Sequence, residues 1–425
     1  MNITSVSPKV MKAFGSAAMM LTMLILLSGC VKDSCETTMT YLVYDPVIKT
    51  LEEVRSEFKV EAPRGLTKTG KIYIYNQYLL VSEPEQGLHV IDNSNPSHPV
   101  PISFVRIPGN KDMAVKNNVL YADNYMDLLV LDISNPADIV LKGRKEFAMP
   151  GNFSKTTDGK YVVGYTAREV TEVYPSDCDG GNMWRGGGAT TMMDSEISAQ
   201  GGNKSSGGPN KGGSMARFTI YKDYLYIVST SSLIPYNIAV PSAPEKLAEV
   251  KIGWGIETIY PYNDNLFIGS TDGMFIYGLE NPAQPVKKSA FSHVRSCDPV
   301  VVEGNIAYVT LRSGTPCEGF TNQLEVLDVT DLNNPKLLKT YQMTNPHGLG
   351  IDNGTLFICD GADGLKVYDA TEAEKLDKIG HYEGMETYDV IPYGNNLILS
   401  SKDGIYQYSY ADPKNLVLLS KIALH

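Results

Sequence analysis

The chain has 425 residues, of which 43% are hydrophobic and 20% charged, and its formal net charge is −11. This is the composition of a globular protein with enough apolar residues for a large core. The acidic balance and the lack of any basic run argue against nucleic acid as a partner and against flat binding to anionic lipid.

The N-terminus has the features of an export signal. Lys9 and Lys12 precede a short apolar run, Met19 to Leu27, which is too short to span a membrane with structured flanks. Ser28 and Gly29 then lead into Cys30, an arrangement that resembles the bacterial lipobox. We therefore expect residues 1–29 to be a lipoprotein signal peptide and Cys30 to carry the lipid that anchors the protein in a membrane. A plain signal peptide is the alternative.

Residues 30–68 form an anchor and lead-in segment. Lys32-Asp33, close behind Cys30, resembles the tag that directs lipoproteins of Bacteroidetes-type bacteria to the cell surface. This predicts an outer-membrane protein that faces outward, with the periplasmic face as the alternative. Thr50, followed by acids and by apolar residues at helical spacing, predicts one short helix within Thr50 to Phe58.

A ten-residue unit recurs through the rest of the chain. Its clearest copy is Asp127 to Pro136 (DLLVLDISNP), and related segments begin at Gly87, Ser232, Gly273, Gln323, Gly364 and Gly404. The starts differ by 40, 105, 41, 50, 41 and 40 residues, and a period near 40 is typical of stacked supersecondary units.

Each repeat contains four short runs of β-branched and aromatic residues separated by turn signals such as Asn-Asn, Asp-Gly and Asn-Pro. Four strands in about 40 residues is typical of one propeller blade, which buries both faces against its neighbours. We expect an all-β fold, a β-propeller over residues 69–425, with eight blades favoured and seven as the alternative. One of the eight is a degenerate unit at 152–178, and the Gly- and Ser-rich residues 179–214 are expected to be a flexible surface insertion.

The repeat resembles the LVIVD repeat in four cores, Leu88 to Asp92, Leu129 to Asp132, Leu324 to Asp328 and Leu365 to Asp369. That resemblance implies a β-propeller of bacterial surface and secreted proteins, mostly without assigned activity. The aspartates that close these cores stand directly before turns. We expect them to accept hydrogen bonds from turn N–H groups and not to form a catalytic ring.

The best candidate binding site is the place where the innermost strands begin, because these points surround one mouth of the central channel. Alignment of the repeats puts polar residues there: Lys111, Asp112, Arg217, Glu257, Asp298, His347 and Asp389. The simpler alternative is that these residues are polar only because solvent fills the channel mouth. His347 lacks a second histidine at metal-ligand spacing, so we expect no metal and no cofactor.

Five cysteines remain besides Cys30, and pairing is expected in an exported protein. Cys297, Cys317 and Cys359 fall on the channel-mouth side of adjacent repeats. We expect a disulfide within this trio, with Cys317 and Cys359 as the first choice.

Three functions are consistent with these features. The first is a binding or interaction module for a glycan, a peptide or a partner protein. The second is a hydrolase or lyase of extracellular polymer that uses His347 with Asp298 or Glu257 as acid and base. The third is a scaffold for outer-membrane assembly.

Overall fold

The computed structural model describes residues 35–149, 153–176, 203–204, 210–214, 216–292, 299–313 and 321–425. The chain divides into two compact units, residues 1–47 with 165–191 and residues 48–164 with 192–425. None of the helices in these ranges combines the length and the apolar character that a membrane crossing requires. The expected signal peptide and the lipidation site at Cys30 lie outside the described residues.

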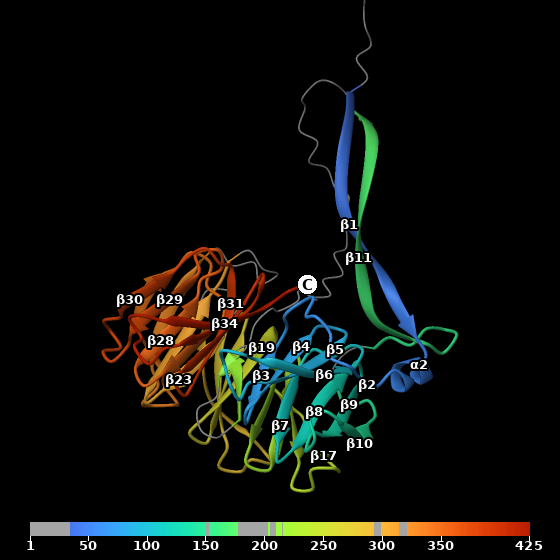
Figure 1. The fold of residues 1–425 in the computed structure, drawn as a ribbon, viewed down its shortest axis with the longest axis horizontal. Coiled ribbons are helices and arrows are strands. Elements are labelled where there is room, and N and C mark those ends of the chain that lie inside the picture. The colour runs from blue at the N-terminus through green and yellow to red at the C-terminus, as the bar shows by residue number, and fades with distance from the viewer. Residues whose placement is uncertain are drawn as a thin grey trace, which may run out of the picture. The chain divides into compact units, whose positions relative to one another are not determined.

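The smaller unit is built on a two-stranded ribbon, in which β1 (Cys35–Lys49) pairs with β11 (Tyr161–Ser176) (Figure 1). Within it, Arg168 Nε donates to Asp45 Oδ2 at 2.5 Å. Tyr44 and Val173 are among several large side chains of the ribbon that are more than half exposed. A ribbon of two strands buries little surface by itself.

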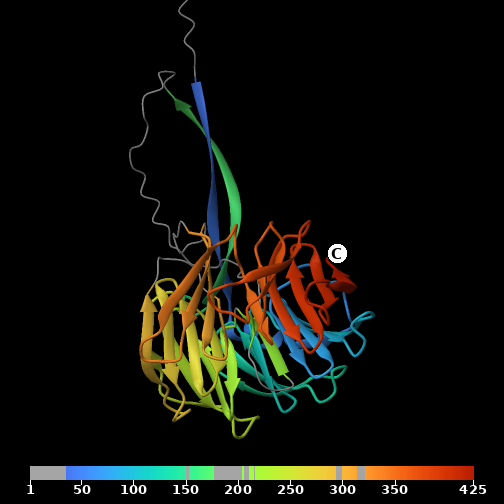
Figure 2. The same ribbon diagram turned by 90° about the vertical axis from the view of Figure 1, so that its left-hand side faces the viewer.

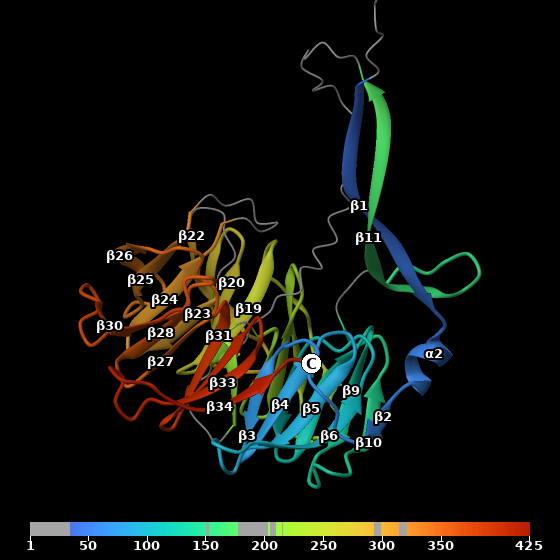
Figure 3. The ribbon, with the colours of Figure 1, turned by 45° about the horizontal axis from the view of Figure 1, so that its top comes forward.

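The larger unit contains seven four-stranded blades within the described ranges, each antiparallel and each in sequence order from the inside outward (Figure 3). Blade 1 has β3 (Ile72–Tyr75), β4 (Tyr78–Glu83), β5 (Gly87–Asp92) and β6 (Val100–Arg106). Blade 2 has β7 (Met113–Lys116), β8 (Val119–Asn124), β9 (Asp127–Asp132) and β10 (Val140–Lys145). Blade 3 has β14 (Phe218–Tyr221), β15 (Tyr224–Val228), β16 (Ser232–Asn237) and an outer strand in two pieces, β17 (Glu245–Lys246) and β18 (Val250–Lys251).

The remaining four blades are regular. Blade 4 has β19 (Ile256–Tyr262), β20 (Asn265–Ser270), β21 (Gly273–Gly278) and β22 (Val286–Ser292). Blade 5 has β23 (Val300–Glu303), β24 (Ile306–Leu311), β25 (Gln323–Asp328) and β26 (Lys336–Gln342). Blade 6 has β27 (Leu349–Asp352), β28 (Thr355–Cys359), β29 (Leu365–Asp369) and β30 (Asp377–Tyr382). Blade 7 has β31 (Thr387–Tyr393), β32 (Asn396–Ser401), β33 (Gly404–Ser409) and β34 (Val417–Ala423).

The blade number corrects the first expectation of eight. The degenerate unit at 152–178 is not a blade, because its strand-like residues form the single long strand β11, which pairs with β1. The all-β propeller and the stated alternative of seven blades are confirmed.

Figure 2 shows neighbouring blades side by side, and the clusters of buried apolar residues join adjacent blades. The middle strands β8 and β9 are buried along almost their whole length, whereas the outer strand β10 alternates with exposed positions. Burial on both sides of the middle strands explains why their sequences are continuous apolar runs. The aspartates that close the repeats behave as expected: Asp92, Asp132, Asp328 and Asp369 each accept the N–H two residues on, at 2.8 to 3.1 Å.

The ring closes between blade 7 and blade 1 without exchange of a strand, because the four strands of blade 7 all come from residues 387–423. Ser420 in the outer strand of blade 7 donates to Pro96 O at 2.6 Å. Ser103 in the outer strand of blade 1 makes the equivalent contact with Pro136 O at 2.9 Å. The closing junction is therefore built like an internal one.

The lead-in adds to blade 1. Helix α2 (Leu51–Ser56) begins after Thr50, whose side chain accepts from Glu53 N while Glu53 accepts from Thr50 N. This reciprocal capping satisfies two of the helix's unpaired N–H groups. Next, β2 (Lys59–Glu61) pairs with β6 as an additional outermost strand.

The Gly-rich segment differs from the expected surface insertion in its described part. β12 (Asn203–Lys204) pairs with β13 (Asn210–Ser214), and β13 pairs with β3, the innermost strand of blade 1. β13 also contacts the innermost strands β7, β19, β27 and β31. Its backbone therefore lies inside the ring of innermost strands.

Candidate functional site

One side chain from each blade joins a ring at the channel mouth, where the innermost strands begin and the second strands end. In blade order its members are Lys71, Asp112, Arg217, Glu257, Arg312, His347 and Asp389. Five of them are the predicted residues Asp112, Arg217, Glu257, His347 and Asp389. We call this set the mouth ring.

The ring begins with a buried ion pair between blades 1 and 2. Lys71 Nζ lies 2.9 Å from Asp112 Oδ2, and both residues are buried. The same carboxylate oxygen accepts from the backbone N–H groups of Arg217 at 2.6 Å and Phe218 at 3.1 Å. Asp112 thus connects three blades, which is a structural role. Burial lowers the pKa of Lys71, and the Asp112 carboxylate opposes this shift.

Lys111 lies beside the ring and not in it. Its ammonium group is 3.4 Å from Glu85, and both side chains are exposed. Its backbone N–H, with that of Asp112, donates to the buried Asp123. Burial raises the pKa of Asp123 to about 7. Lys111 is therefore outside the group of residues that the structure brings together.

Glu257 is the acid of the ring between two guanidinium groups. Burial raises its pKa to about 7, and Arg217 and Arg312 act against that rise. Glu257 is partly exposed, so water reaches this part of the mouth. Among the described residues, no carboxylate pairs with Arg217 or Arg312 within 4.0 Å; Arg312 contacts His347 instead. Arg217 Nε is buried and has no hydrogen-bond partner in the described part of the chain.

His347 faces a cation. Arg312 Nη1 lies 2.9 Å from His347 Nδ1, and Tyr388 packs edge-on against the imidazole at 5.5 Å between ring centroids. Because the guanidinium can only donate, Nδ1 must be unprotonated. Burial and the Arg312 charge lower the pKa of His347 to about 3. His347 is thus a neutral acceptor at ordinary pH.

Asp389 completes the ring. A β-carbon at Gly348 would lie 2.1 Å from Asp389 Oδ1, so the glycine after His347 gives this carboxylate its space. Asp389 also interacts electrostatically with Lys71, so the last member of the mouth ring, in blade 7, lies near the first member, in blade 1. Basic and acidic groups alternate at six of the seven positions, and the seventh is His347. An odd ring cannot alternate throughout, and the neutral His347 stands at the mismatch.

The cysteine prediction is corrected in part. Cys359 is a buried free thiol at the end of β28, so the expected pairing of Cys317 with Cys359 is not observed. Burial raises its pKa well above the usual value. Cys297 and Cys317, like the predicted site residue Asp298, lie outside the described residues.

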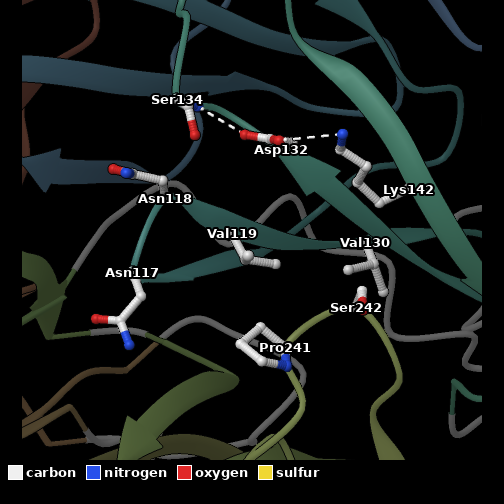
Figure 4. Close-up of a pocket in the computed structure, with 9 residues that line it drawn as sticks. All are labelled: Asn117, Asn118, Val119, Val130, Asp132, Ser134, Lys142, Pro241 and Ser242. Carbon is white, nitrogen blue, oxygen red and sulfur yellow. Dashed lines mark hydrogen bonds and ion pairs between the residues drawn. The ribbon is translucent and has the colours of Figure 1, made fainter.

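The described residues contain two weaker candidate sites. A cavity of about 390 Å³ opens beside the turns at Asn118 and Asp132 in blade 2 and at Pro241 in blade 3 (Figure 4). It lies at the opposite ends of the strands from the mouth ring, and Asp132 there is already paired with Lys142 at 3.3 Å.

The second feature is a cluster of Asp363, His381 and Glu383, whose ligand atoms lie within 4.8 Å of one another. Lys366 Nζ is 2.6 Å from Asp363, so an ammonium group already supplies positive charge at this cluster. The mouth ring therefore remains the best candidate site.

Two members of the ring were missed from the sequence. Lys71 stands seven residues before β4, as Asp112 stands seven residues before β8, so extending the alignment to the first repeat would have found it. Arg312 follows the second strand of blade 5 and not the start of an innermost strand. Searching the ends of the second strands as well would have found Arg312, because both positions lie at the same end of adjacent strands.

The raised pKa of Glu257 predicts a pH-dependent stability. The unfolded carboxyl ionises near pH 4.5 and the folded one near pH 7, so the folded state holds more protons between these values. The contribution of Glu257 therefore favours folding below about pH 4.5 and weakens as the pH rises to 7. Glu257→Gln is expected to reduce the difference in the free energy of unfolding between pH 4.5 and pH 8 by about 1–3 kcal/mol.

Urea unfolding at the two pH values measures this difference. Glu372→Gln, at an exposed acid, is the matched control. An unchanged difference in Glu257→Gln would contradict the prediction.

The comparisons with known proteins agree with the fold. The LVIVD repeat model matches residues 67–105 and 110–146, which are blades 1 and 2.

Among solved structures, the Pseudomonas aeruginosa periplasmic gluconolactonase PpgL has a TM-score of 0.54 at 10% identity, over 83% of this chain and 96% of that one. Saccharomyces cerevisiae Sqt1 has a TM-score of 0.52 at 8% identity, over 87% and 88% of the two chains. These identities show a shared fold alone. No curated protein matches the sequence. The chain is thus a β-propeller with LVIVD repeats.

Proposed function

We propose that this β-propeller is a lipid-anchored binding protein of the bacterial outer membrane, displayed on the cell surface, whose mouth ring recognises a ligand that carries carboxylate groups. The binding surface consists of Arg217, Glu257 and Arg312 on blades 3 to 5. One observation carries the proposal: two guanidinium groups flank the partly buried carboxyl of Glu257, and neither pairs with a described carboxylate within salt-bridge range.

The state of the two arginines makes them suited to an anionic ligand. Arg217 has a buried donor, Nε, without a partner, and Arg312 donates to a neutral imidazole. A buried donor without a partner costs about 1–3 kcal/mol, so the Arg217 guanidinium is not already satisfied by a described acceptor at Nε. Guanidinium groups bind carboxylates by two parallel hydrogen bonds, so a ligand carboxylate satisfies this geometry.

The enzymatic alternative has less support from the contacts. A general base must accept a proton near the working pH, and His347 has a pKa near 3 because it is buried against Arg312. Its described polar side-chain neighbours are Arg312 and Asn345, and neither is a carboxylate. The scaffold alternative rests on no contact within the described residues.

Binding to acidic polymers tests the proposal. The probes are polygalacturonate, poly-L-glutamate and the neutral polymer dextran, measured by calorimetry. We expect the protein to bind one of the acidic polymers and not dextran, and we expect R217M/R312M to weaken that binding at least 10-fold. The double variant K375M/K378M removes two exposed charges at the other end of blade 6 and is the matched control. Failure to bind either acidic polymer, or equal binding by R217M/R312M, would overturn the proposal.

The proposed location at the cell surface depends on the sequence from Lys9 to Asp33. Protease treatment of intact cells tests this location, because a protein on the surface is digested. Full protection of the protein would place it on the periplasmic side.

A further inference from the structure

An exposed tryptophan stands next to the mouth ring. Trp254 is 79% exposed, the highest value among the large apolar side chains that the structure describes. It lies between β18 and β19, in the connection that leads from blade 3 into blade 4. Two residues later β19 begins, and Glu257 is its second residue. Three residues of chain span at most about 11 Å, so the backbones of Trp254 and Glu257 are within that distance.

The loop that carries Trp254 is held on both sides. Ile252 N donates to Ser231 O at 3.0 Å, and Ile256 N donates to Thr230 O at 3.1 Å, which ties the loop to the hairpin of blade 3. Thr271 N donates to Gly255 O at 2.9 Å, which ties it to blade 4. Gly255 has a φ of +67°, a conformation that glycine adopts without strain. The indole is thus displayed by a fixed backbone.

The groups of the adjacent mouth ring set the chemistry of the ligand. A flat aromatic face in water stacks well on a ring whose C–H groups form an apolar face. Arg217 and Arg312 supply guanidinium donors on either side of Glu257, and Glu257 supplies an acceptor for hydroxyl groups. A sugar ring with a carboxylate, which is a uronic acid, has all three features at once. It offers an apolar face, an anion and hydroxyl donors.

An acidic peptide fits less well. Peptides gain affinity from strand pairing at a free edge or from apolar pockets for their side chains. The inner edge of β3 is already paired with β13, and the cavity described above lies at the opposite ends of the strands. The net charge of −11 repels polyanions from the rest of the surface, so a polyanion must be bound by local groups.

We infer that Trp254, Arg217, Glu257 and Arg312 form a subsite for a uronic-acid residue of an extracellular polysaccharide, with Trp254 stacked on the sugar ring. The inference rests on the proposed function and adds the class of ligand to it. Trp254 contributes the stacking face, and the two arginines contribute the contact to the carboxylate.

The chain offers a specific probe, because it has two tryptophans, Trp184 and Trp254. In the W184F variant of the full chain, all tryptophan fluorescence comes from Trp254. Titration with oligogalacturonate is expected to change this fluorescence, with saturation, and galacturonate monomer is expected to bind more weakly than the oligomer. The methyl-esterified oligomer is expected to bind at least 10-fold more weakly, because it has the same sugar ring without the charge.

Two substitutions of Trp254 distinguish a loss of stacking on the ligand from a loss of folding. In calorimetry, W254A is expected to weaken binding of oligogalacturonate at least 10-fold, and W254F, which keeps a flat face, less than 3-fold. Both are expected to leave the melting temperature unchanged, because the side chain is exposed. If W254A binds as tightly as wild type, or if poly-L-glutamate binds and oligogalacturonate does not, the inference fails. The proposed function would survive that result if R217M/R312M still abolished binding of the acidic polymer.

Discussion

Replacement of Asp112 by alanine is expected to lower the free energy of unfolding by about 3–5 kcal/mol. The substitution leaves the buried ammonium of Lys71 without the carboxylate that lies 2.9 Å away. It also leaves the N–H groups of Arg217 and Phe218 without their acceptor. The loss is large because it combines an uncompensated buried charge with lost hydrogen bonds at a junction of three blades. Urea unfolding at constant pH measures it.

Two comparisons show whether the charge is responsible. Asp377→Ala removes the partner of Lys375 in an exposed pair at 2.9 Å and is expected to cost less than about 1 kcal/mol. The double variant K71M/D112N removes both charges and is expected to be at least about 1 kcal/mol more stable than D112N alone, because no buried charge remains uncompensated. A loss in Asp112→Ala no larger than that in Asp377→Ala would show that the pair does not support the fold.

Replacement of Gly273 by alanine is expected to lower the free energy of unfolding by about 3 kcal/mol or more. A β-carbon there would lie 2.2 Å from Phe291 O, and φ is +152°. The obstacle is the backbone of the adjacent strand, which cannot move aside like a side chain. The same position in blades 1 and 7 is Gly87 and Gly404, with contacts of 2.0 and 2.2 Å.

The control for this prediction is Gly394→Ala. Gly394 has a φ of +58°, but nothing lies within 4 Å of its β-carbon position. It therefore reports the cost of the backbone conformation alone, about 1 kcal/mol. If Gly273→Ala costs no more than Gly394→Ala, the close approach of the two strands is not the reason for glycine at this position. Thermal or urea unfolding distinguishes the two results.

The features that could be predicted from the sequence are those that depend on residues close together in the chain. The turn role of Asp92, Asp132, Asp328 and Asp369 followed from a short acid before a turn, and the structure has each bond. The blade number did not follow, because a long strand that pairs with β1 has the same composition as two short strands of a blade. Which strand a segment pairs with depends on residues more than a hundred positions away.

The same distinction between local and long-range contacts applies to the residues of the candidate site. Five ring positions came from the alignment of the repeats, which places equivalent residues at equivalent points. Arg312 did not, because its part in the ring depends on a contact between blades, whereas Lys71 occupies the equivalent point of the first repeat. The role of His347 changed for the same reason: its neighbour Arg312 is 35 residues away in sequence, and it makes the imidazole a neutral acceptor.

The closing junction has a mechanical consequence. Blade 7 takes no strand from the N-terminal side of the chain, and blade 1 carries β2 as an extra strand outside β6. A pull on the chain before Leu51 would first load α2, whose Arg55 lies 3.0 Å from Asp127 of blade 2, and then the three residues of β2. Peeling these elements away would leave the four strands of blade 1 paired, and the next contact to carry the load would be the isolated bridge between Leu66 and Leu424 at the closing junction.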